Sequence, residues 1–351
     1  MIKKSRYLLY PLSILYSFVI RVRNWLYDKN ILKSAEFNFP VICVGNLATG
    51  GTGKTPMTEY LVELLSTRYS VATLSRGYKR KTKGFAIAGP NTTAIEIGDE
   101  PMQFHQKFPN VTVAVGEERI VAIPQLLHEK PDTDVIILDD AFQHRQVRAG
   151  LNILLTEFSK PYVNDEILPA GNLRDNISSA SRAHIIIVTK CPGDIGTEEK
   201  LKLTKKLHPK PTQSVFFTKI VYASPVHLFS RQAYSVSRST GILLICGIAN
   251  PVPLVSYLKE SFDQIEVMQF SDHHIFRSDD LLNIKKNFEK LDAHPKIILT
   301  TEKDGVRLEK FKAELEEFPI YVLPIRHQFL FGEEQVFSER VERFVREIKR
   351  G

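Results

Sequence analysis

An apolar run that leads directly into a glycine-rich loop is the feature that most constrains this chain. The stretch VICVGNLATGGTGKTP covers residues 41–56 and places three glycines just before Lys54 and Thr55. Glycines let backbone N–H groups point inward around phosphate oxygens, and a following helix N-terminus adds a favourable dipole. The lysine would reach the β- and γ-phosphates, and the threonine hydroxyl would bind Mg²⁺. The residues expected to bind the nucleotide are Thr49, Gly50, Gly51, Thr52, Gly53, Lys54 and Thr55.

The residues around this loop predict an α/β fold. Apolar runs recur up to residue 190 as VICVG, VATLS, VTVAVG, VIILDD, LNILLT and IIIVTK. Several are apolar on both faces, as strands of a covered parallel sheet are. The intervening PMTEYLVELLSTR has apolar residues at helical spacing and a proline in its first turn. This alternation predicts a P-loop NTPase-type doubly wound, mainly parallel sheet, and the runs after residue 240 predict a second, smaller α/β domain.

A second motif, VIILDDAFQH, supplies carboxylates to the same site. It delivers Asp139 and Asp140 to the carboxyl end of a buried strand, and ligands bind at that edge of a parallel sheet. A carboxylate there can hold Mg²⁺ directly or through water, and the sequence does not decide which of the two aspartates does so. A solvated acidic turn is the alternative.

A later stretch, VTKCPGD, bears on the choice of nucleotide. Thr189 stands where a guanine-reading motif has asparagine, which favours ATP over GTP.

The N-terminus has basic residues on both sides of an apolar run. Lys3, Lys4 and Arg6 precede YLLYPLSILYSFVI, and RVRNW follows it. The run is too short to cross a bilayer as a helix, and no small-residue cleavage site of a signal peptide follows. We expect a helix that lies in the membrane interface over residues 1–27, with a buried core helix as the alternative.

The net charge limits the classes of binding partner, and the cysteine content indicates the redox compartment. The net charge of +7 favours an anionic ligand or a lipid surface, although such an excess can also serve solubility alone. No aromatic-basic RNA module or zinc-finger spacing is present, so we expect no nucleic acid partner. Two of the three cysteines lie in apolar runs and none forms a CxxC pair, which is typical of buried thiols in a reducing compartment.

Three further polar stretches have no packing explanation, and the residues alone leave their roles open. LSRGYKRKTKG follows the second strand and suits an anionic substrate, but a basic run is by default a solvated loop. IGDEP carries Asp99 and Glu100, and FSDHHIF carries Asp272, His273 and His274. Isolated Asp–His pairs are mostly surface or structural residues, so a catalytic role does not follow from spacing.

The motifs together resemble the tetraacyldisaccharide 4'-kinase family, the lipid A 4'-kinases of Gram-negative bacteria. The resemblance covers roughly residues 7 to 330 and rests on the order of ten stretches. They are VGNLATGGTGKTP, LSRGYKR, GDEP, GEERIVA, LDDAFQH, LPAGNLRD, VTKCP, CGIANP, FSDHH and TEKDGVRL. One departure is Ala141, where the family has glycine, and it matters only if that position needs a positive φ.

The resemblance implies a reaction and roles for the unexplained residues. It implies Mg²⁺-dependent transfer of the ATP γ-phosphoryl group to the 4'-hydroxyl of an acylated glucosamine disaccharide 1-phosphate, giving the 4'-phosphorylated lipid A precursor. It also implies a catalytic dyad of Asp99 and His273, with each residue in a different domain. Further implied catalytic residues are Lys54, Asp139 and Asp140; metal ligands are Thr55, Asp139, Asp140 and Glu100; substrate contacts are Arg76, Tyr78, Arg119, Asn172 and Arg174.

The expected organisation has four parts and a membrane location. These are a membrane-associating helix (1–27), a nucleotide-binding domain (28–213), linker strands with the smaller domain (214–330) and an amphipathic C-terminal helix (331–351). A monomer on the cytoplasmic face of the bacterial inner membrane, peripheral or monotopic, fits this organisation. A membrane-associated P-loop switch ATPase and a nucleotide-binding scaffold remain as alternatives, but neither explains the SDHH stretch.

Overall fold

The computed structural model describes residues 6–350 as two compact units. Unit 1 contains the chain up to Thr92, Phe104–Val221 and the chain from Arg326 onward. Unit 2 contains Thr93–Gln103 and Tyr222–Ile325. The mixed α/β, mostly parallel architecture predicted from the sequence is confirmed. The division differs from the expected one, because residues 93–103 group with the second unit and residues 214–221 and 326–330 with the first.

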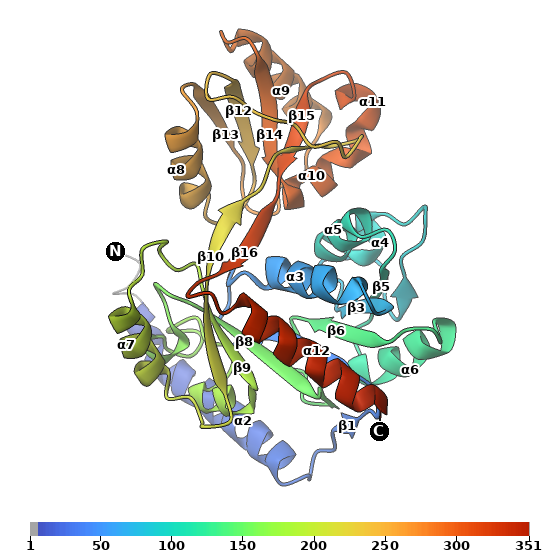
Figure 1. Cartoon of the computed structure of the whole chain (residues 1–351), viewed down its shortest axis with the longest axis vertical. Helices are drawn as coiled ribbons and strands as arrows, with labels where there is room; N and C mark the ends of the chain where they lie inside the picture. The colour runs from blue at the N-terminus through green and yellow to red at the C-terminus, as the bar shows by residue number, and fades with distance from the viewer. Residues whose placement is uncertain (1–5, 351) are drawn as a thin grey trace. The chain divides into compact units, whose positions relative to one another are not determined.

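A nine-stranded sheet forms the centre of unit 1 (Figure 1). The neighbouring strands from β10 to β5 pair in parallel, and the edge strand β4 pairs antiparallel with β5. In spatial order its strands are β16 (Ile325–Phe329), β10 (Ser214–Tyr222), β9 (Ile185–Thr189), β8 (Leu151–Glu157), β2 (Val41–Asn46), β6 (Val135–Asp139), β3 (Val71–Ser75), β5 (Thr112–Val115) and β4 (Ala86–Ile87). The linker strand β10 therefore pairs with β16, and not with the PIYVLP strand that the sequence suggested as its partner. A separate two-stranded sheet joins β1 (Ala35–Glu36) to β7 (Val147–Arg148).

Helices cover both faces of this sheet, which is why its strands are apolar on both sides. Ile42 and Val44 of β2 pack on one face with Met57 and Leu61, while Cys43 packs on the other. The helices of the first face are α3 (Lys54–Ser66) and α12 (Glu334–Arg350); those of the second are α6 (Arg119–Glu129) and α7 (Thr197–Leu207). Unit 1 also holds the end of α5 (Asp99–Lys107), from Phe104 onward, and three short 3₁₀ helices, η1 (Tyr7–Leu9), η2 (Tyr162–Asn164) and η3 (Ile177–Arg182).

Unit 2 is a smaller sheet with helices on both faces. Its strand order is β11 (Val226–His227), β15 (Ile320–Leu323), β14 (Lys296–Thr301), β12 (Gly241–Cys246) and β13 (Ile265–Gln269), and only β11 is antiparallel. Its helices are α4 (Ala94–Ile97), α5 up to Gln103, α8 (Val252–Ser261), α9 (Ser278–Lys290), α10 (Glu302–Leu308), η4 (Glu309–Phe311) and α11 (Lys312–Leu315). The carboxyl ends of β12, β13 and β14 meet at one edge, as parallel pairing requires.

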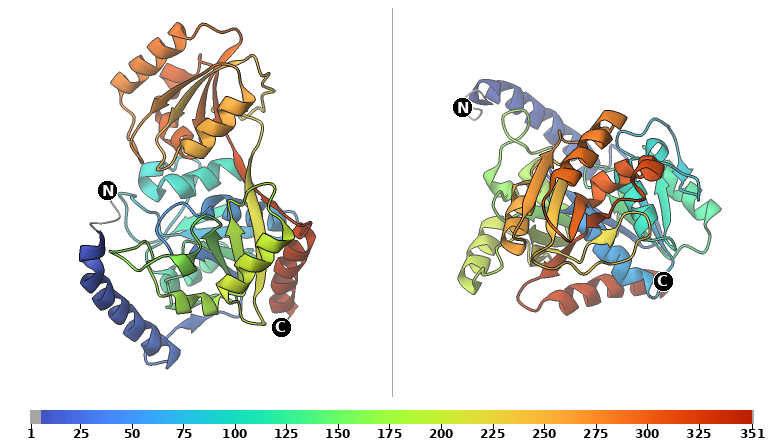
Figure 2. Two further views of the ribbon diagram at one scale, coloured as in Figure 1. Left: turned by 90° about the vertical axis from the view of Figure 1, so that its left-hand side faces the viewer. Right: turned by 90° about the horizontal axis from the view of Figure 1, so that it is seen from above.

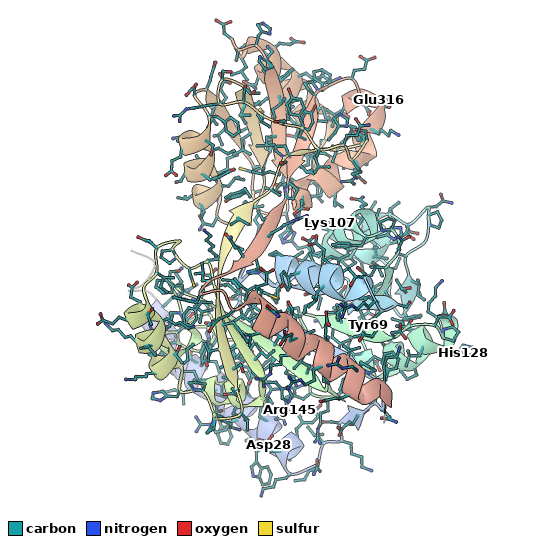
Figure 3. All side chains as sticks on the ribbon, viewed as in Figure 1. Asp28, Tyr69, Lys107, His128, Arg145 and Glu316 are labelled. Carbon is teal, nitrogen blue, oxygen red and sulfur yellow. The ribbon has the colours of Figure 1, made fainter. Side chains whose placement is uncertain are left out.

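The N-terminal helix α2 (Tyr10–Asp28) lies on the outside of unit 1 (Figure 2). Its buried residues are Ser13, Asn24 and Tyr27, whereas Ile14, Leu15 and Phe18 are each at least 60% exposed. Its last turn is held by Arg145, which forms an ion pair of 2.6 Å with Asp28 (Figure 3). None of the helices in the described part of the chain is long and apolar enough to cross a membrane.

Candidate active site

The phosphate loop has the geometry that its sequence predicts. It joins the buried strand β2 to α3, and Gly50 and Gly53 have φ angles of +111° and +85° that side chains rarely adopt. A Cβ atom added at Gly50 or Gly51 would meet nothing within 4 Å. The loop therefore presents an open, glycine-lined surface at the N-terminus of a helix, which is the arrangement that binds phosphate.

Two polar side chains from the adjacent strands, those of Asn46 and Thr189, support the phosphate loop through Thr52. Asn46 donates a hydrogen bond of 2.9 Å to the hydroxyl of Thr52, and Thr189 donates one of 2.9 Å to the Thr52 carbonyl. All three side chains are buried, so each of these hydrogen bonds satisfies a group that would otherwise be costly. Thr189, which the sequence analysis considered only as a base-reading position, thus supports the phosphate loop.

The last loop glycine has a further support that the sequence did not indicate. The Nε2 atom of His327 lies 2.9 Å from the Gly53 carbonyl, and its Nδ1 lies 2.9 Å from the Thr218 hydroxyl. A carbonyl only accepts, so Nε2 carries the proton and the hydroxyl donates to Nδ1. Burial lowers the pKa of His327 to about 4. The ring therefore stays neutral near pH 7 and holds Gly53 through one defined tautomer.

The two aspartates after β6 have different environments. Asp139 is 2% exposed and accepts a hydrogen bond of 3.1 Å from Thr58. Asp140 accepts two hydrogen bonds from Arg174, of 2.7 and 3.1 Å, and lies 3.7 Å from the Lys54 ammonium. Burial alone would raise the pKa of Asp140, but the Arg174 hydrogen bonds and the Lys54 charge lower it below its usual value. The Asp140 carboxylate is therefore charged at neutral pH.

The residue with a positive φ at this turn is Asp140 and not Ala141, which explains why alanine is tolerated at position 141. Asp140 has a φ of 47°, and Ala141 is not among the described residues with a positive φ. Aspartate visits this region more readily than most residues because its short side chain can bond locally. Glycine at position 141 is therefore not required by the backbone.

A hard divalent cation fits the donors at this edge of unit 1. Thr55 lies in the first turn of α3, while Asp139 ends the neighbouring strand β6 and Asp140 follows it, so the site offers hydroxyl and carboxylate oxygens. Such oxygens are the ligands that Mg²⁺ prefers. The fourth predicted ligand, Glu100, belongs to unit 2, where it lies 3.9 Å from the Lys303 ammonium. No group of three or more His, Cys, Asp or Glu residues forms a preassembled metal site within residues 6–350.

Cations gather beside the aspartates. Arg119 is 2% exposed, and its Nε and Nη2 atoms have no hydrogen-bond partner. Burial lowers the pKa of Arg119 to about 10, an effect that the charge of Asp139 opposes. Burial, then the charges of Arg119 and Arg76, lower the pKa of His144 to about 4. A buried guanidinium with unused donors beside a second arginine is suited to bind an anion. Tyr78, in the same loop as Arg76, is 65% exposed.

A second cluster lies at the strand edge of unit 2, around Arg307 of α10. Its Nε and Nη2 atoms lie 2.8 and 2.7 Å from Oδ2 of Asp99, the first residue of α5. Nη2 also lies 3.0 Å from Nδ1 of His273, and Nη1 donates to Asp304 over 2.9 Å. Asp304 is fully buried, which fixes the guanidinium from behind.

The predicted pair of Asp99 and His273 is thus brought together, but with Arg307 between them. Oδ2 of Asp99 and Nδ1 of His273 are 3.8 Å apart, which is too far for a direct hydrogen bond. Both residues belong to unit 2, so the expectation that they lie in different domains is wrong. The only sequence signal for Arg307 was its place in the TEKDGVRL stretch, which also contains Lys303.

Asn172 is engaged within the protein. Its amide donates to both oxygens of Asp165, over 3.3 and 2.9 Å, and its Oδ1 accepts from Arg6 over 3.2 Å. Arg174 likewise binds Asp140 and Asn46. Both residues therefore shape the surroundings of the phosphate loop.

The glycine loop and the paired carboxylates beside it define an α/β nucleotide-binding protein of the P-loop type. The family described as tetraacyldisaccharide-1-P 4'-kinase matches residues 5–346. The chain belongs to this family.

Individual members of the family match this chain over nearly their full length. The tetraacyldisaccharide 4'-kinase of Bacteroides thetaiotaomicron is 45% identical, with 97% of this chain and 94% of the relative covered. That of Flavobacterium johnsoniae is also 45% identical, with 97% and 98% covered. A crystal structure of LpxK from Aquifex aeolicus in complex with ATP has a TM-score of 0.77 and 29% identity, and covers 98% of this chain and 100% of its own.

Proposed function

We propose that this chain transfers the γ-phosphoryl group of ATP to the 4'-hydroxyl of tetraacyldisaccharide 1-phosphate, which yields the 4'-phosphorylated lipid A precursor. Family membership carries this proposal, because the match spans residues 5–346 and includes both strand-edge clusters. A switch ATPase would need the phosphate loop and aspartates of unit 1, but not the Asp99, Arg307 and His273 cluster of unit 2.

In this proposal, unit 1 binds the nucleotide. The phosphate loop from Thr49 to Thr55 surrounds the phosphates with backbone N–H groups, and Lys54 leaves Asp140 to reach the transferred group. Thr55, Asp139 and Asp140 would hold Mg²⁺, with Glu100 as a further ligand, and the cation would neutralise charge on the phosphate oxygens. Arg119 binds the phosphorylated sugar headgroup through its unused donors. Arg76 and Tyr78 contact the same headgroup.

Asp99 is the base that accepts the proton of the acceptor hydroxyl. Arg307 only donates, so the nitrogen of His273 that it contacts must accept. The Nε2 atom of His273 lies 3.3 Å from the Lys303 ammonium, which also only donates, so neither ring nitrogen is directed at the acceptor hydroxyl. The carboxylate of Asp99 remains as the acceptor, while Arg307 and His273 orient it. A sugar hydroxyl is a poor nucleophile near neutral pH, and such a base assists its deprotonation.

The first test is transfer of labelled γ-phosphate from ATP to tetraacyldisaccharide 1-phosphate in detergent micelles. We expect labelled lipid that depends on Mg²⁺ and a product phosphorylated at the 4'-position. Hydrolysis of ATP measured without lipid is the control, and it should be slow. Lipid-independent hydrolysis with no labelled lipid would overturn the kinase proposal in favour of a switch ATPase.

We further propose that α2 binds the cytoplasmic face of the inner membrane, where both ATP and the lipid substrate are available, and that the enzyme acts there as a monomer. The side chains of Ser13, Ser17 and Asn24 on α2 bind the protein. The apolar residues Ile14, Leu15 and Phe18 are exposed, as is Leu8 of the preceding η1. Arg21 and Arg23 suit anionic headgroups, and Trp25, which is 51% exposed, suits the interface.

We expect the double substitution Leu15→Ser and Phe18→Ser to lower binding to vesicles of phosphatidylcholine and phosphatidylglycerol by at least tenfold. Burying two such side chains in lipid contributes on the order of 3 to 6 kcal/mol, so their loss is large against the binding free energy. Vesicle co-sedimentation measures the effect. The matched control is Leu201→Ser, since Leu201 of α7 is 55% exposed. Equal binding by the double variant and the wild type would contradict the membrane role of α2.

A further inference from the structure

The residues that connect α2 to the phosphate loop form one continuous segment, residues 170–179, which we name the strap. Its central part runs antiparallel to the start of the loop, with a bridge between Ala48 and Leu173. The Arg174 amide donates to the Leu47 carbonyl over 2.7 Å, and the Thr49 amide donates to the Asn172 carbonyl over 2.7 Å. The strap therefore fixes the backbone at the entrance of the phosphate loop.

The strap also places Arg174 in the nucleotide site. The guanidinium of this residue binds Asp140 in a bidentate manner and donates to the side chain of Asn46. Asn46 in turn donates to Thr52 in the loop. A displacement of the strap would therefore change its backbone contact with Thr49 and move Arg174. It would thereby disturb the partners of Arg174, which are Asp140 and Asn46.

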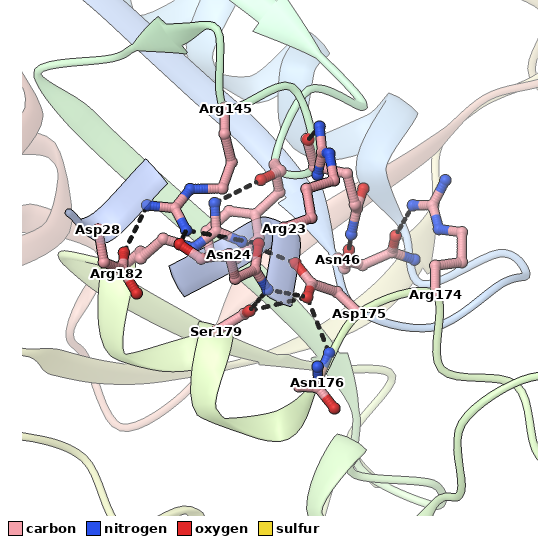
Figure 4. A network of polar contacts seen from close by, with 12 residues as sticks. Arg23, Asn24, Asp28, Asn46, Arg145, Arg174, Asp175, Asn176, Ser179 and Arg182 are labelled. Carbon is pink, nitrogen blue, oxygen red and sulfur yellow. Dashed lines mark hydrogen bonds and ion pairs between the residues drawn. The ribbon is translucent and has the colours of Figure 1, made fainter. Parts of the chain in front are cut away.

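Helix α2 contacts the strap at several points, and Figure 4 shows those made by Asn24. Ser13 accepts a hydrogen bond of 2.8 Å from the Ala170 amide, and Ser17 donates one of 2.8 Å to Asn176. Asn24 donates to Asp175 over 2.8 Å and to Ser179 over 3.2 Å. Asn24, Asp175 and Ser179 are all buried, so loss of one partner leaves the others unsatisfied.

A second connection reaches the same asparagine from another side. Arg23 of α2 donates to the Gln143 carbonyl over 3.3 Å, and the Gln143 amide donates to the Asn46 carbonyl over 2.7 Å. Both connections consist of polar contacts. The opposite, apolar side of α2 has no such anchor within the described chain, since Ile14, Leu15 and Phe18 are exposed.

We propose that Ser17 and Asn24 are positioning residues through which a lipid surface bound to α2 strengthens ATP binding. Lipid that buries the apolar side of α2 holds the helix in the register in which its polar side binds the strap. The strap then holds Arg174 and the loop entrance in their nucleotide-binding positions. This inference rests on the membrane location of α2 proposed above. Because coupling is reciprocal, ATP must strengthen membrane binding by the same factor.

The test measures the dissociation constant of ATP by calorimetry, with and without saturating vesicles of phosphatidylcholine and phosphatidylglycerol. No lipid substrate is present, so the result does not depend on phosphoryl transfer. For the wild type we expect vesicles to tighten ATP binding about fivefold or more, the lower end of typical coupling. Saturating ATP should raise the vesicle partition coefficient by the same factor.

Two variants separate positioning from membrane binding. Asn24→Leu is expected to bind vesicles like the wild type, because the apolar side is intact, but to lose the vesicle effect on ATP. Ser17→Ala removes a single hydrogen bond and should lose part of the effect, and it serves if Asn24→Leu does not fold, as judged by thermal unfolding. Leu201→Ser is the control and should respond like the wild type.

Three results would overturn the inference. They are an unchanged ATP dissociation constant for the wild type on vesicles, a full response by the folded variants, and absence of wild-type vesicle binding. The last would also remove the membrane role of α2. The kinase proposal stands or falls separately, by transfer of labelled phosphate in micelles.

Discussion

Replacing Asp99 with asparagine should lower kcat for phosphoryl transfer by about 10²- to 10⁴-fold, the usual contribution of a general base. Asparagine has the same shape and can still accept from Arg307, so the surrounding hydrogen bonds of 2.8 and 2.7 Å need not break. What is lost is the negative charge that accepts the hydroxyl proton. The measurement is steady-state transfer to the lipid, together with the dissociation constant of ATP, which should stay within about twofold of wild type.

The control for this substitution is Asp279→Asn, in the same unit. Asp279 is exposed in the first turn of α9, as Asp99 is part of the first turn of α5, so the two changes share helix position and charge. Asp279→Asn should have wild-type kcat. If Asp99→Asn kept kcat within a factor of two, Asp99 could not be the base, and His273 would have to be considered in its place.

Replacing Lys54 with methionine should lower kcat/KM by about 10²- to 10³-fold or more, because a charge aimed at the transferred phosphoryl group stabilises the transition state strongly. Little stability should be lost. The Lys54 ammonium lies 3.7 Å from Asp140, which keeps its closer partner Arg174 at 2.7 Å. The readouts are transfer kinetics and thermal unfolding.

Lys202→Met on α7 is the matched control, since Lys202 is an exposed lysine in a helix of the same unit. A Lys54→Met enzyme with near wild-type kcat/KM would refute the role of this lysine. If activity and unfolding temperature fell together, lost folding would be the simpler cause, and Lys54→Arg would separate the two.

The sequence predicted those parts of the site that depend on local order along the chain. The glycine loop is defined by neighbours in sequence, and Asp139 and Asp140 were placed correctly because the carboxyl ends of parallel strands share one edge. The same reasoning predicted the apolar face of α12, whose Phe337, Val341 and Val345 are fully buried. Periodicity and strand order suffice for such features.

Residues that act across long sequence distances could not be found in this way. His327 supports Gly53 from 274 positions away, and Arg307 reaches Asp99 from 208 positions away. Histidine and arginine are both common at positions outside functional sites, so their spacing in the sequence gives no signal. The division into units could not be predicted for the same reason, because proximity in space and not order along the chain groups Asp99 with His273 and Arg307.

The orientation of α2 has a consequence for the protein away from lipid. The hydroxyl and amide side chains of α2 bind its own protein, and its apolar side is exposed to the solvent beside Arg21 and Arg23, the reverse of an ordinary surface helix. In detergent-free buffer, two molecules can shield these sides against each other. Dimers or larger species seen in such a buffer would then reflect the missing bilayer, and should dissolve into single molecules when a mild detergent is added.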